Sequence, residues 1–384
     1  MFFLLGVGCI PGVAVTNICF ALTLACAIAW RLSARGRGED FLGPFRRTTP
    51  LHAPIGVFVL LSVLSCFFST LPSQSLVQIK GLGTFLLVVF VAALLDDMDD
   101  VKLVADAWRI TALYLVLRGF AEWISGTPSL NFRISGGLSV YMTYAGLLLV
   151  LVPLLGSRGL AGGLRGERLA DAAVAAAGAL AMALTLTRGA YVGLAIGLLA
   201  VLLAGRPRLA LAAPVAIALF FVLMPLAVRD RLMSVTNPKD VTMNDRVAMW
   251  RAGGAMIAER PLFGVGPKRV KALYPSYRFP GWVEPHPGHL HNNLVMIAAE
   301  TGIPSALAYL AFVGSFFLGA VRIVRSAPRG DPLRWIALGA VGAMAGLFAA
   351  GMFEYNFGDV EVLMATLVVA TLPFAAARAT RPAD

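Results

Sequence analysis

The chain has 384 residues, of which 58% are hydrophobic and only 14% are charged, and its net charge is +11. Soluble domains carry about 25% charged residues, so this composition excludes an ordinary soluble protein. The excess of Lys and Arg does not indicate nucleic-acid binding, because no zinc-ligand or RNA-binding signature accompanies it and basic loops are usual in membrane proteins.

Apolar stretches of about 20 residues, long enough to cross ~30 Å of hydrocarbon, recur along the chain. They predict an all-α polytopic membrane bundle, because lipid requires each helix to satisfy its own backbone groups. We expect 11 or 12 spans, because residues 2–30 form either one long helix or two short helices broken at Pro11 and Gly12. The predicted spans are 10–30, 54–71, 80–96, 103–125, 137–156, 170–187, 189–204, 207–227, 303–325, 334–354 and 360–377.

Two of these spans carry small residues at every fourth position. Gly189, Gly193 and Gly197 form one stripe, and Gly342 and Gly346 form another. Such stripes allow helix backbones to approach closely. They predict helix packing and imply no chemistry.

Basic residues orient the bundle, because short cytoplasmic loops are enriched in Lys and Arg. Alternate loops and the C-terminal tail carry Arg31, Arg35, Arg37, Arg46, Arg47, Arg158, Arg165, Arg168, Arg206, Arg208, Arg322, Arg325, Arg329, Arg334, Arg378 and Arg381. These loops are predicted to face the cytoplasm.

The opposite side carries one long polar segment, residues 228–290. Loops of this length are usually functional or disordered, and aromatic residues such as Trp250, Tyr274 and Trp282 favour a folded one, with an amphipathic helix near 244–259. Three parts are therefore expected. They are an N-terminal transmembrane bundle (1–227), a periplasmic loop with short helices (228–290), and a C-terminal part (291–384). The C-terminal part begins with the start of a periplasmic helix and continues with transmembrane helices.

Several cations are predicted to lie on the outer face, against the usual charge bias, among them Lys80, Arg133, Arg188, Arg246 and Arg269. Arg and Lys bind phosphate through charge-assisted hydrogen bonds, so an anionic ligand is one interpretation. Pairing with loop acids or lipid headgroups is the other. The anionic ligand is favoured for Arg188, which has no acid nearby in sequence.

His291 ends the long loop and begins a predicted helical stretch that Gly302 stops. A histidine at a membrane interface can exchange a proton near neutral pH, but on residue chemistry alone a capping or interface histidine that makes one hydrogen bond is the favoured interpretation. His286 and His289 lie close in sequence, but the spacing of the three histidines matches no standard metal motif. Neither a metal nor a cofactor is expected.

The order His291-Asn292, nine residues, Gly302 resembles the signature of bacterial O-antigen ligases. Ser305 stands at the last motif position, where Gly, Thr or Tyr is usual. Two further blocks resemble the same family. One contains Asp245-Arg246, Trp250 and Arg260–Pro267, and the other is Thr187–Ala190.

The resemblance implies a membrane fold similar to the C-type glycosyltransferases and a metal-independent, inverting transfer. A glycan would move from undecaprenyl pyrophosphate to a sugar hydroxyl of lipid A–core oligosaccharide, at the periplasmic face of the bacterial inner membrane. The catalytic histidine would be His291, and the pyrophosphate ligands Arg188, Arg246 and Lys80. Further substrate-binding or orienting candidates are Asn292, Arg133, Arg269, Glu300, Glu354 and Asp359.

The alternative is an O-antigen polymerase or a related lipid-linked glycan transferase, since such proteins share these motifs more loosely. A membrane transporter is the alternative from another class. Transporters place ionisable residues near the bilayer midplane, whereas only Arg109 and Arg118 look deeply placed in this sequence.

Overall fold

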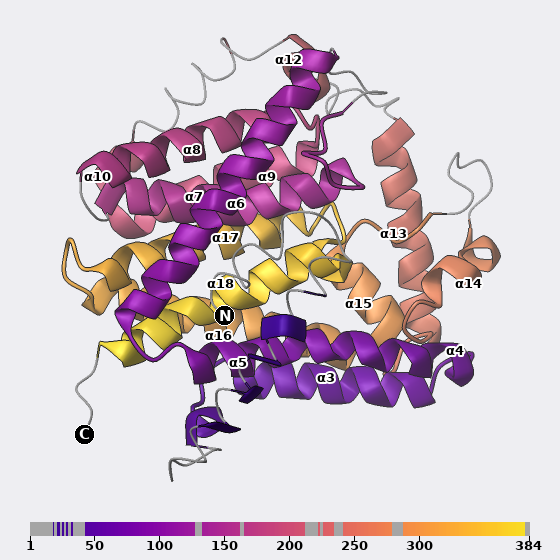
Figure 1. The fold of residues 1–384 in the computed structure, drawn as a ribbon. Coiled ribbons are helices and arrows are strands. Elements are labelled where there is room, and N and C mark those ends of the chain that lie inside the picture. Colours follow the sequence, from indigo (N-terminus) through magenta and orange to yellow (C-terminus); the bar gives the residue numbers. More distant parts are fainter. Residues whose placement is uncertain are drawn as a thin grey trace.

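The computed structural model describes residues 43–126, 133–161, 165–211, 226–233, 241–278 and 287–380, with residue 222 and isolated positions before residue 34. Over this part of the chain the fold is all-helical and no strand occurs, as predicted (Figure 1). Most residues of the predicted spans 10–30 and 207–227 lie outside the described residues.

The helix bounds are as follows. The first half contains η1 (Gly43–Arg46), α3 (His52–Phe67), α4 (Pro72–Leu76), η2 (Val77–Phe85), α5 (Leu86–Leu94), α6 (Met98–Ser125), α7 (Tyr141–Ala161) and α8 (Arg165–Ala183). The second half contains α9 (Arg188–Gly205), α10 (Pro207–Ala210), α12 (Leu226–Met233), α13 (Val241–Glu259), α14 (Val270–Tyr277), α15 (Asn293–Thr301), α16 (Ile303–Ser326), α17 (Pro332–Ala350), η4 (Asn356–Gly358) and α18 (Val360–Ala379).

Six helical segments of the described part are long and apolar enough to cross a membrane. They are Pro72–Leu94, Tyr141–Leu160, Arg188–Gly205, Ile303–Ser326, Pro332–Ala350 and Val360–Ala379. The chain is therefore a polytopic integral membrane protein. The predicted spans 54–71, 103–125 and 170–187 correspond to the helices α3, α6 and α8, which are not among these six.

The two predicted glycine stripes pack against each other, α9 on α17. A Cβ atom added at Gly193 would lie 2.6 Å from the carbonyl oxygen of Gly346, and one at Gly197 would lie 2.6 Å from that of Gly342. No real Cβ tolerates such a distance, so the helices meet backbone to backbone. Because Arg188 begins α9 and Glu354 follows α17, this contact fixes the relative position of two candidate site residues.

Replacement of Gly193 by leucine is expected to destabilise the bundle by about 1–3 kcal/mol, because the added side chain overpacks this contact. A melting curve of the purified protein in detergent measures the effect. Gly314→Leu is the matched control, since Gly314 is also a helical glycine and nothing lies within 4 Å of its missing Cβ. Equal melting temperatures for the two variants would contradict the close contact.

Four charged side chains of the helices α6, α7 and α8 form ion pairs with one another. The buried carboxylate of Asp171 contacts Arg109 Nε at 3.0 Å and Arg158 Nε at 3.3 Å, and Asp106 contacts Arg158 Nη2 at 2.7 Å. Arg109 is thus part of a paired network that joins three helices. This arrangement favours a structural role over a conduction path.

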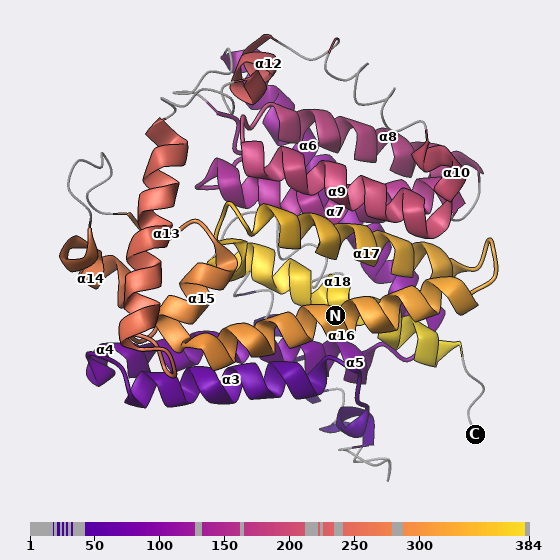
Figure 2. The same cartoon turned by 180° about the vertical axis from the view of Figure 1, so that it is seen from behind.

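The segment between α12 and α15 is folded against the bundle. The predicted helix near 244–259 is observed as α13, and Met249, Met256, Val270 and Tyr274 form a separate apolar cluster there. Backbone N–H groups of Val265 and Gly266 donate to the carbonyls of Ala299 and Glu300 at 2.8 and 2.9 Å. Consequently α15 is held between the bundle and this segment (Figures 1 and 2).

Candidate functional site

The start of α15 presents His291 in a constrained backbone position. The helix begins at Asn293 rather than at His291, because Asn292 is the N-cap and its side chain accepts a hydrogen bond from the Val295 amide at 3.0 Å. The Asn292 amide also donates to the Met352 carbonyl at 3.0 Å. Its observed bonds fit an orienting role. His291 precedes the cap at φ 49°, a conformation that only a few per cent of non-glycine residues adopt.

Asn293 joins α15 to the turn that follows α17. Its backbone N–H donates to the Gly351 carbonyl at 2.7 Å, and its side-chain oxygen accepts from the Phe357 amide at 3.1 Å. The side chain is buried and also donates to the Tyr309 hydroxyl at 3.4 Å. These bonds place residues 351–358 directly beside His291.

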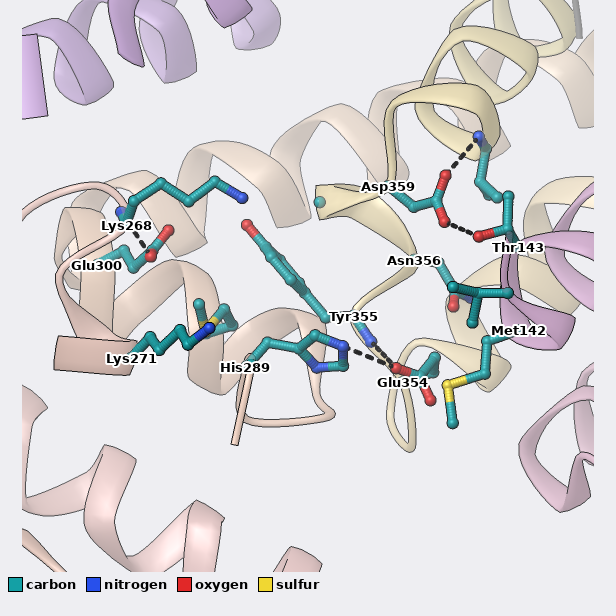
Figure 3. A pocket seen from close by; sticks show the side chains of 15 residues that line it. Met142, Thr143, Lys268, Lys271, His289, Glu300, Glu354, Tyr355, Asn356 and Asp359 are labelled. Atoms are coloured by element: carbon teal, nitrogen blue, oxygen red, sulfur yellow. Dashed lines mark hydrogen bonds and ion pairs between the residues drawn. The ribbon is translucent and has the colours of Figure 1, made fainter. Parts of the chain in front are cut away.

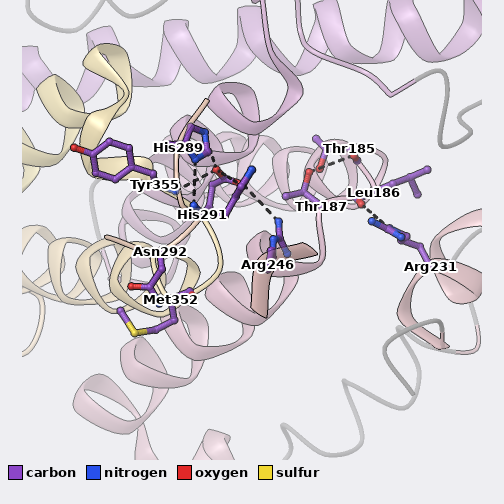
Figure 4. Close-up of polar contacts among 11 residues, drawn as sticks. Thr185, Leu186, Thr187, Arg231, Arg246, His289, His291, Asn292, Met352 and Tyr355 are labelled. Atoms are coloured by element: carbon purple, nitrogen blue, oxygen red, sulfur yellow. Dashed lines mark hydrogen bonds and ion pairs between the residues drawn. The ribbon is translucent and has the colours of Figure 1, made fainter. Parts of the chain in front are cut away.

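Arg246, His289 and His291 lie close together (Figure 4), and all three contact Glu354. Its carboxylate lies 3.1 Å from His291 Nδ1, 3.5 Å from His289 Nε2 and 3.6 Å from Arg246 Nη2. The side chain is buried, with 7% of its surface exposed. Burial raises the pKa of Glu354, but the hydrogen bond from His291 and the electrostatic interactions with His291, His289 and Arg246 outweigh it and hold the pKa below its usual range.

These contacts define the proton positions on both histidines. The His291 backbone N–H donates to His289 Nδ1 at 3.3 Å, so the proton of neutral His289 lies on Nε2, facing Glu354. Burial, the largest influence, lowers the pKa of His289 to about 4 even though Glu354 opposes it, and this histidine is therefore neutral at pH 7. His291 directs Nδ1 at the carboxylate and donates there, which leaves its Nε2 as an acceptor.

A cavity of about 420 Å³ adjoins this group of residues (Figure 3). Lys268, Lys271 and Glu300 lie toward one end, and Thr143, Glu354 and Asp359 toward the other. Tyr355 lies between them, and burial raises its pKa, so its hydroxyl keeps its proton. A mixture of acidic, basic and aromatic side chains around a cavity of this size suits a polyhydroxylated ligand.

Two carboxylates of the cavity, Glu300 and Asp359, also accept hydrogen bonds from the backbone. Glu300 accepts a 2.7 Å hydrogen bond from the Lys268 amide, and burial raises its pKa to about 7 although the Lys268 charge opposes this. Asp359 caps α18 by accepting from the Val362 amide at 3.3 Å, and it also accepts from the Thr143 hydroxyl. Glu300 and Asp359 therefore both line the cavity while also supporting the backbone around it.

Arg188 and Arg246 are both buried, each with 9% of its surface exposed, and both approach the turn after α17. Arg246 contacts Glu354 directly. Arg188 is the first residue of α9, and the Cβ position of the adjacent Gly189 lies 3.2 Å from the Phe353 Cβ. Arg246 and the start of α9, which carries Arg188, thus both lie beside the turn that holds Glu354.

Other predicted site residues lie elsewhere. Lys80 is exposed within η2 and does not line the cavity. Arg269 is exposed and donates to Thr70 at 3.2 Å and Gln74 at 2.5 Å. Arg133 stacks over the Tyr141 ring at 4.5 Å. None of the three is seen in contact with His291 or Glu354 in the described part of the chain.

Residues 173–310 match the family model described as O-antigen ligase. Over this range the chain is similar to the O-antigen ligase domain. The exopolysaccharide production protein ExoQ of Rhizobium meliloti (strain 1021) is similar to it, with 26% identity over 332 residues that cover 80% of this chain and 72% of that protein. Together the two similarities support a glycan transferase related to the ligases and polymerases.

Several residues in the matched range and around it line the site although the sequence did not predict them as site residues. His289 was considered only for metal binding, yet its ring lies 4.1 Å from that of His291 and also lines the cavity. Tyr355 and Thr143 line it as well, and both lie outside the matched range. The one signal available was that Tyr355 directly follows Glu354, already a candidate.

His289, His291 and Glu354 each place one ligand atom within 4.8 Å of the other two, so the cluster has room for a metal ion. Arg246, however, already places a positive charge beside the same carboxylate. A second cation there would meet like-charge repulsion. The geometry therefore permits a metal, and the local electrostatics oppose it.

Glycan transfer is expected to persist after treatment with EDTA, because Arg246 already places a positive charge beside Glu354, where a metal would bind. The measurement is product formation by purified protein before and after chelation, with zinc, magnesium or manganese added back. Loss of activity that one of these ions restores would assign a metal to the histidine cluster.

Proposed function

We propose that the protein is an O-antigen ligase that transfers a glycan from undecaprenyl pyrophosphate to a sugar hydroxyl of lipid A–core oligosaccharide, with inversion and without a metal. The observation that carries this proposal is the contact of His291 Nδ1 with the buried carboxylate of Glu354 at 3.1 Å. This contact selects the tautomer in which Nε2 accepts a proton, which is the arrangement of a general base.

The proposed reaction is a single displacement. The acceptor hydroxyl oxygen attacks the anomeric carbon of the donor, and its proton passes to His291 Nε2. The bond from that carbon to the pyrophosphate oxygen breaks, and undecaprenyl pyrophosphate leaves with the electron pair. Attack opposite the leaving group inverts the anomeric configuration. Glu354 stabilises the imidazolium that forms and is a positioning residue.

Arg188 and Arg246 are proposed to bind the pyrophosphate and to stabilise its growing charge as the bond breaks. Their burial favours this role, because a cation withdrawn from water interacts more strongly with phosphate oxygens. The polar cavity is proposed to hold sugar residues, with Glu300 and Asp359 as hydrogen-bond acceptors. Lys80, Arg133 and Arg269 remain weaker proposals. Arg133 and Arg269 are observed in contact with Tyr141, Thr70 and Gln74, Lys80 is exposed within η2, and no described contact brings any of the three to the turn that carries Glu354.

A second candidate function, that of a polymerase, differs from the ligase in the acceptor of the glycan. ExoQ is described as an exopolysaccharide production protein, and that description favours a polymerase, which would join the glycan to a second lipid-linked glycan. The test is to incubate purified protein with the lipid-linked donor and either core lipid A or a second lipid-linked glycan. Consumption of core lipid A supports the ligase, and elongation of the lipid-linked glycan supports the polymerase.

The donor requires a periplasmic site in the inner membrane. Reporters fused within residues 255–285 are therefore expected to read periplasmic, and reporters in 31–50 and 326–333 cytoplasmic, as the positive loops predict. Paired enzymatic reporters, each active on one side only, provide the measurement. A cytoplasmic reading for 255–285 would place His291 on the wrong side for this donor.

A further inference from the structure

A second cavity, of about 810 Å³, lies at the opposite end of the bundle from His291. Its wall includes Arg334 near the start of α17, whereas Glu354 follows the end of that helix. Ala350 lies sixteen positions after Arg334 along α17, which corresponds to about 24 Å. In Figure 1 α10, which also contributes to this cavity, lies at the left, and α13 and α15 lie at the right. The cavity is therefore separate from the candidate active site.

Five arginines converge on this cavity from three segments. They are Arg168 in α8, Arg206 and Arg208 at the junction of α9 and α10, and Arg329 and Arg334 around the start of α17. No lining residue is an acid. The flanking segments 162–164 and 212–221 contain no Asp or Glu either. Five positive charges thus gather around one space without a carboxylate among the residues that line it.

Hydrogen bonds hold three of these guanidinium groups in place. Arg168 and Arg206 both donate to the Leu160 carbonyl, at 3.4 and 3.2 Å, and Arg334 donates to the Ala327 carbonyl at 3.1 Å. A guanidinium has five N–H donors, so each retains donors for another partner. Arg208 and Arg329 form no hydrogen bond or ion pair with any described residue.

The nearest acids in sequence do not neutralise the group. Asp331 caps α17 and accepts from the Leu333 amide at 2.8 Å, and Glu167 is exposed on α8. Neither forms an ion pair with a described arginine of the cavity. A positive-inside bias explains basic loops, but it does not require their side chains to surround one space.

Apolar side chains form another part of the wall. Leu160, Val201, Leu202 and Leu338 line the cavity beside the arginines. A ligand that satisfies both surfaces has a phosphate group and an attached hydrocarbon part. Clusters of basic residues between helices at a membrane surface bind acidic lipid headgroups in this way.

We infer that this five-arginine cavity binds the phosphate of an anionic ligand, and that its apolar wall favours an anionic phospholipid over a free phosphate. The site is independent of glycan transfer, because none of its residues contacts His291, Glu354 or the cavity beside them in the described structure. Bound lipid would cover the exposed ends of α8, α9 and α17 together.

The test uses delipidated, full-length protein in a neutral detergent, titrated with phosphatidylglycerol and followed by native mass spectrometry. The double variant Arg208→Gln/Arg329→Gln removes two charges, and neither side chain forms a hydrogen bond or an ion pair with another described residue. A loss of about fivefold in affinity per arginine is expected, or ~25-fold for the pair. The matched control is Arg322→Gln/Arg325→Gln, which removes two exposed charges from the adjacent α16 without altering the cavity lining.

Selective loss in the cavity variant, with the control near wild type, supports the site. Phosphatidylethanolamine in place of phosphatidylglycerol should bind far more weakly. Competition with inorganic phosphate then separates the two sources: displacement at millimolar phosphate assigns a free anion, and no displacement assigns a lipid. Equal losses in both double variants, at unchanged melting temperatures, would overturn the inference, because the cavity would then act only as part of a basic surface.

Discussion

Replacement of His291 by alanine is expected to lower the rate of glycan transfer by about 10²–10⁴-fold, the usual contribution of a general base. Donor binding should stay near the wild-type value, because the histidine contacts Glu354 and His289 and is not proposed to touch the pyrophosphate. Binding of a labelled undecaprenyl pyrophosphate and single-turnover transfer measure the two quantities separately.

The control for this result is His52→Ala, which removes a histidine at the start of α3 whose Nδ1 contacts Thr49. Transfer by that variant should be unaffected. Glu354→Gln should reduce transfer less than His291→Ala while changing its pH dependence, because the amide cannot stabilise the imidazolium. If His291→Ala abolished donor binding and left transfer per bound donor normal, His291 would be a phosphate ligand or a structural residue.

Replacement of Arg246 by alanine is expected to weaken donor binding by about 10- to 100-fold, the equivalent of a charge-assisted hydrogen bond worth ~1.5–3 kcal/mol. Transfer should slow as well, because positive charge is lost where the leaving group becomes negative. Arg188→Ala is expected to behave in the same way. Lysine at either position should restore only part of the loss, since a point charge replaces a two-pronged donor.

Arg251→Ala is the matched control for Arg246, because Arg251 lies on the same helix, α13, and is exposed. Donor affinity should be unchanged in that variant. An equal loss of affinity in Arg246→Ala and Arg251→Ala would show that α13 attracts the donor only through its general charge. Unchanged affinity in Arg246→Ala would remove Arg246 from the pyrophosphate site.

Hydropathy predicted most of the bundle because each membrane helix must be apolar over a fixed length. The predicted spans 303–325 and 360–377 differ from α16 and α18 by at most two residues at either end. The glycine stripes were equally informative, since small residues at every fourth position have few other uses in a membrane helix. These features depend on local sequence alone.

The candidate site was predicted only in part, because its contacts join residues far apart in the chain. Glu354 was a candidate for orienting an arginine, but nothing in sequence indicated its 3.1 Å contact with His291, which lies 63 positions earlier. Asn293 was not singled out at all, although it holds the turn that carries Glu354. Lys80 differs from Asn293, because the sequence predicted it as a pyrophosphate ligand from its place at the start of a span. In the structure it is exposed within η2, and no described contact brings it to Glu354.

Asn293 also determines what can move during a catalytic cycle. Its backbone and side chain bind Gly351, Phe357 and Tyr309, and its amide lies 2.2 Å from the point where a Cβ on Gly351 would stand. The histidine and its carboxylate therefore belong to one rigid body. In the proposed mechanism, substrates would therefore come to a base whose position Asn293 holds, and any opening and closing would fall to the segments around it.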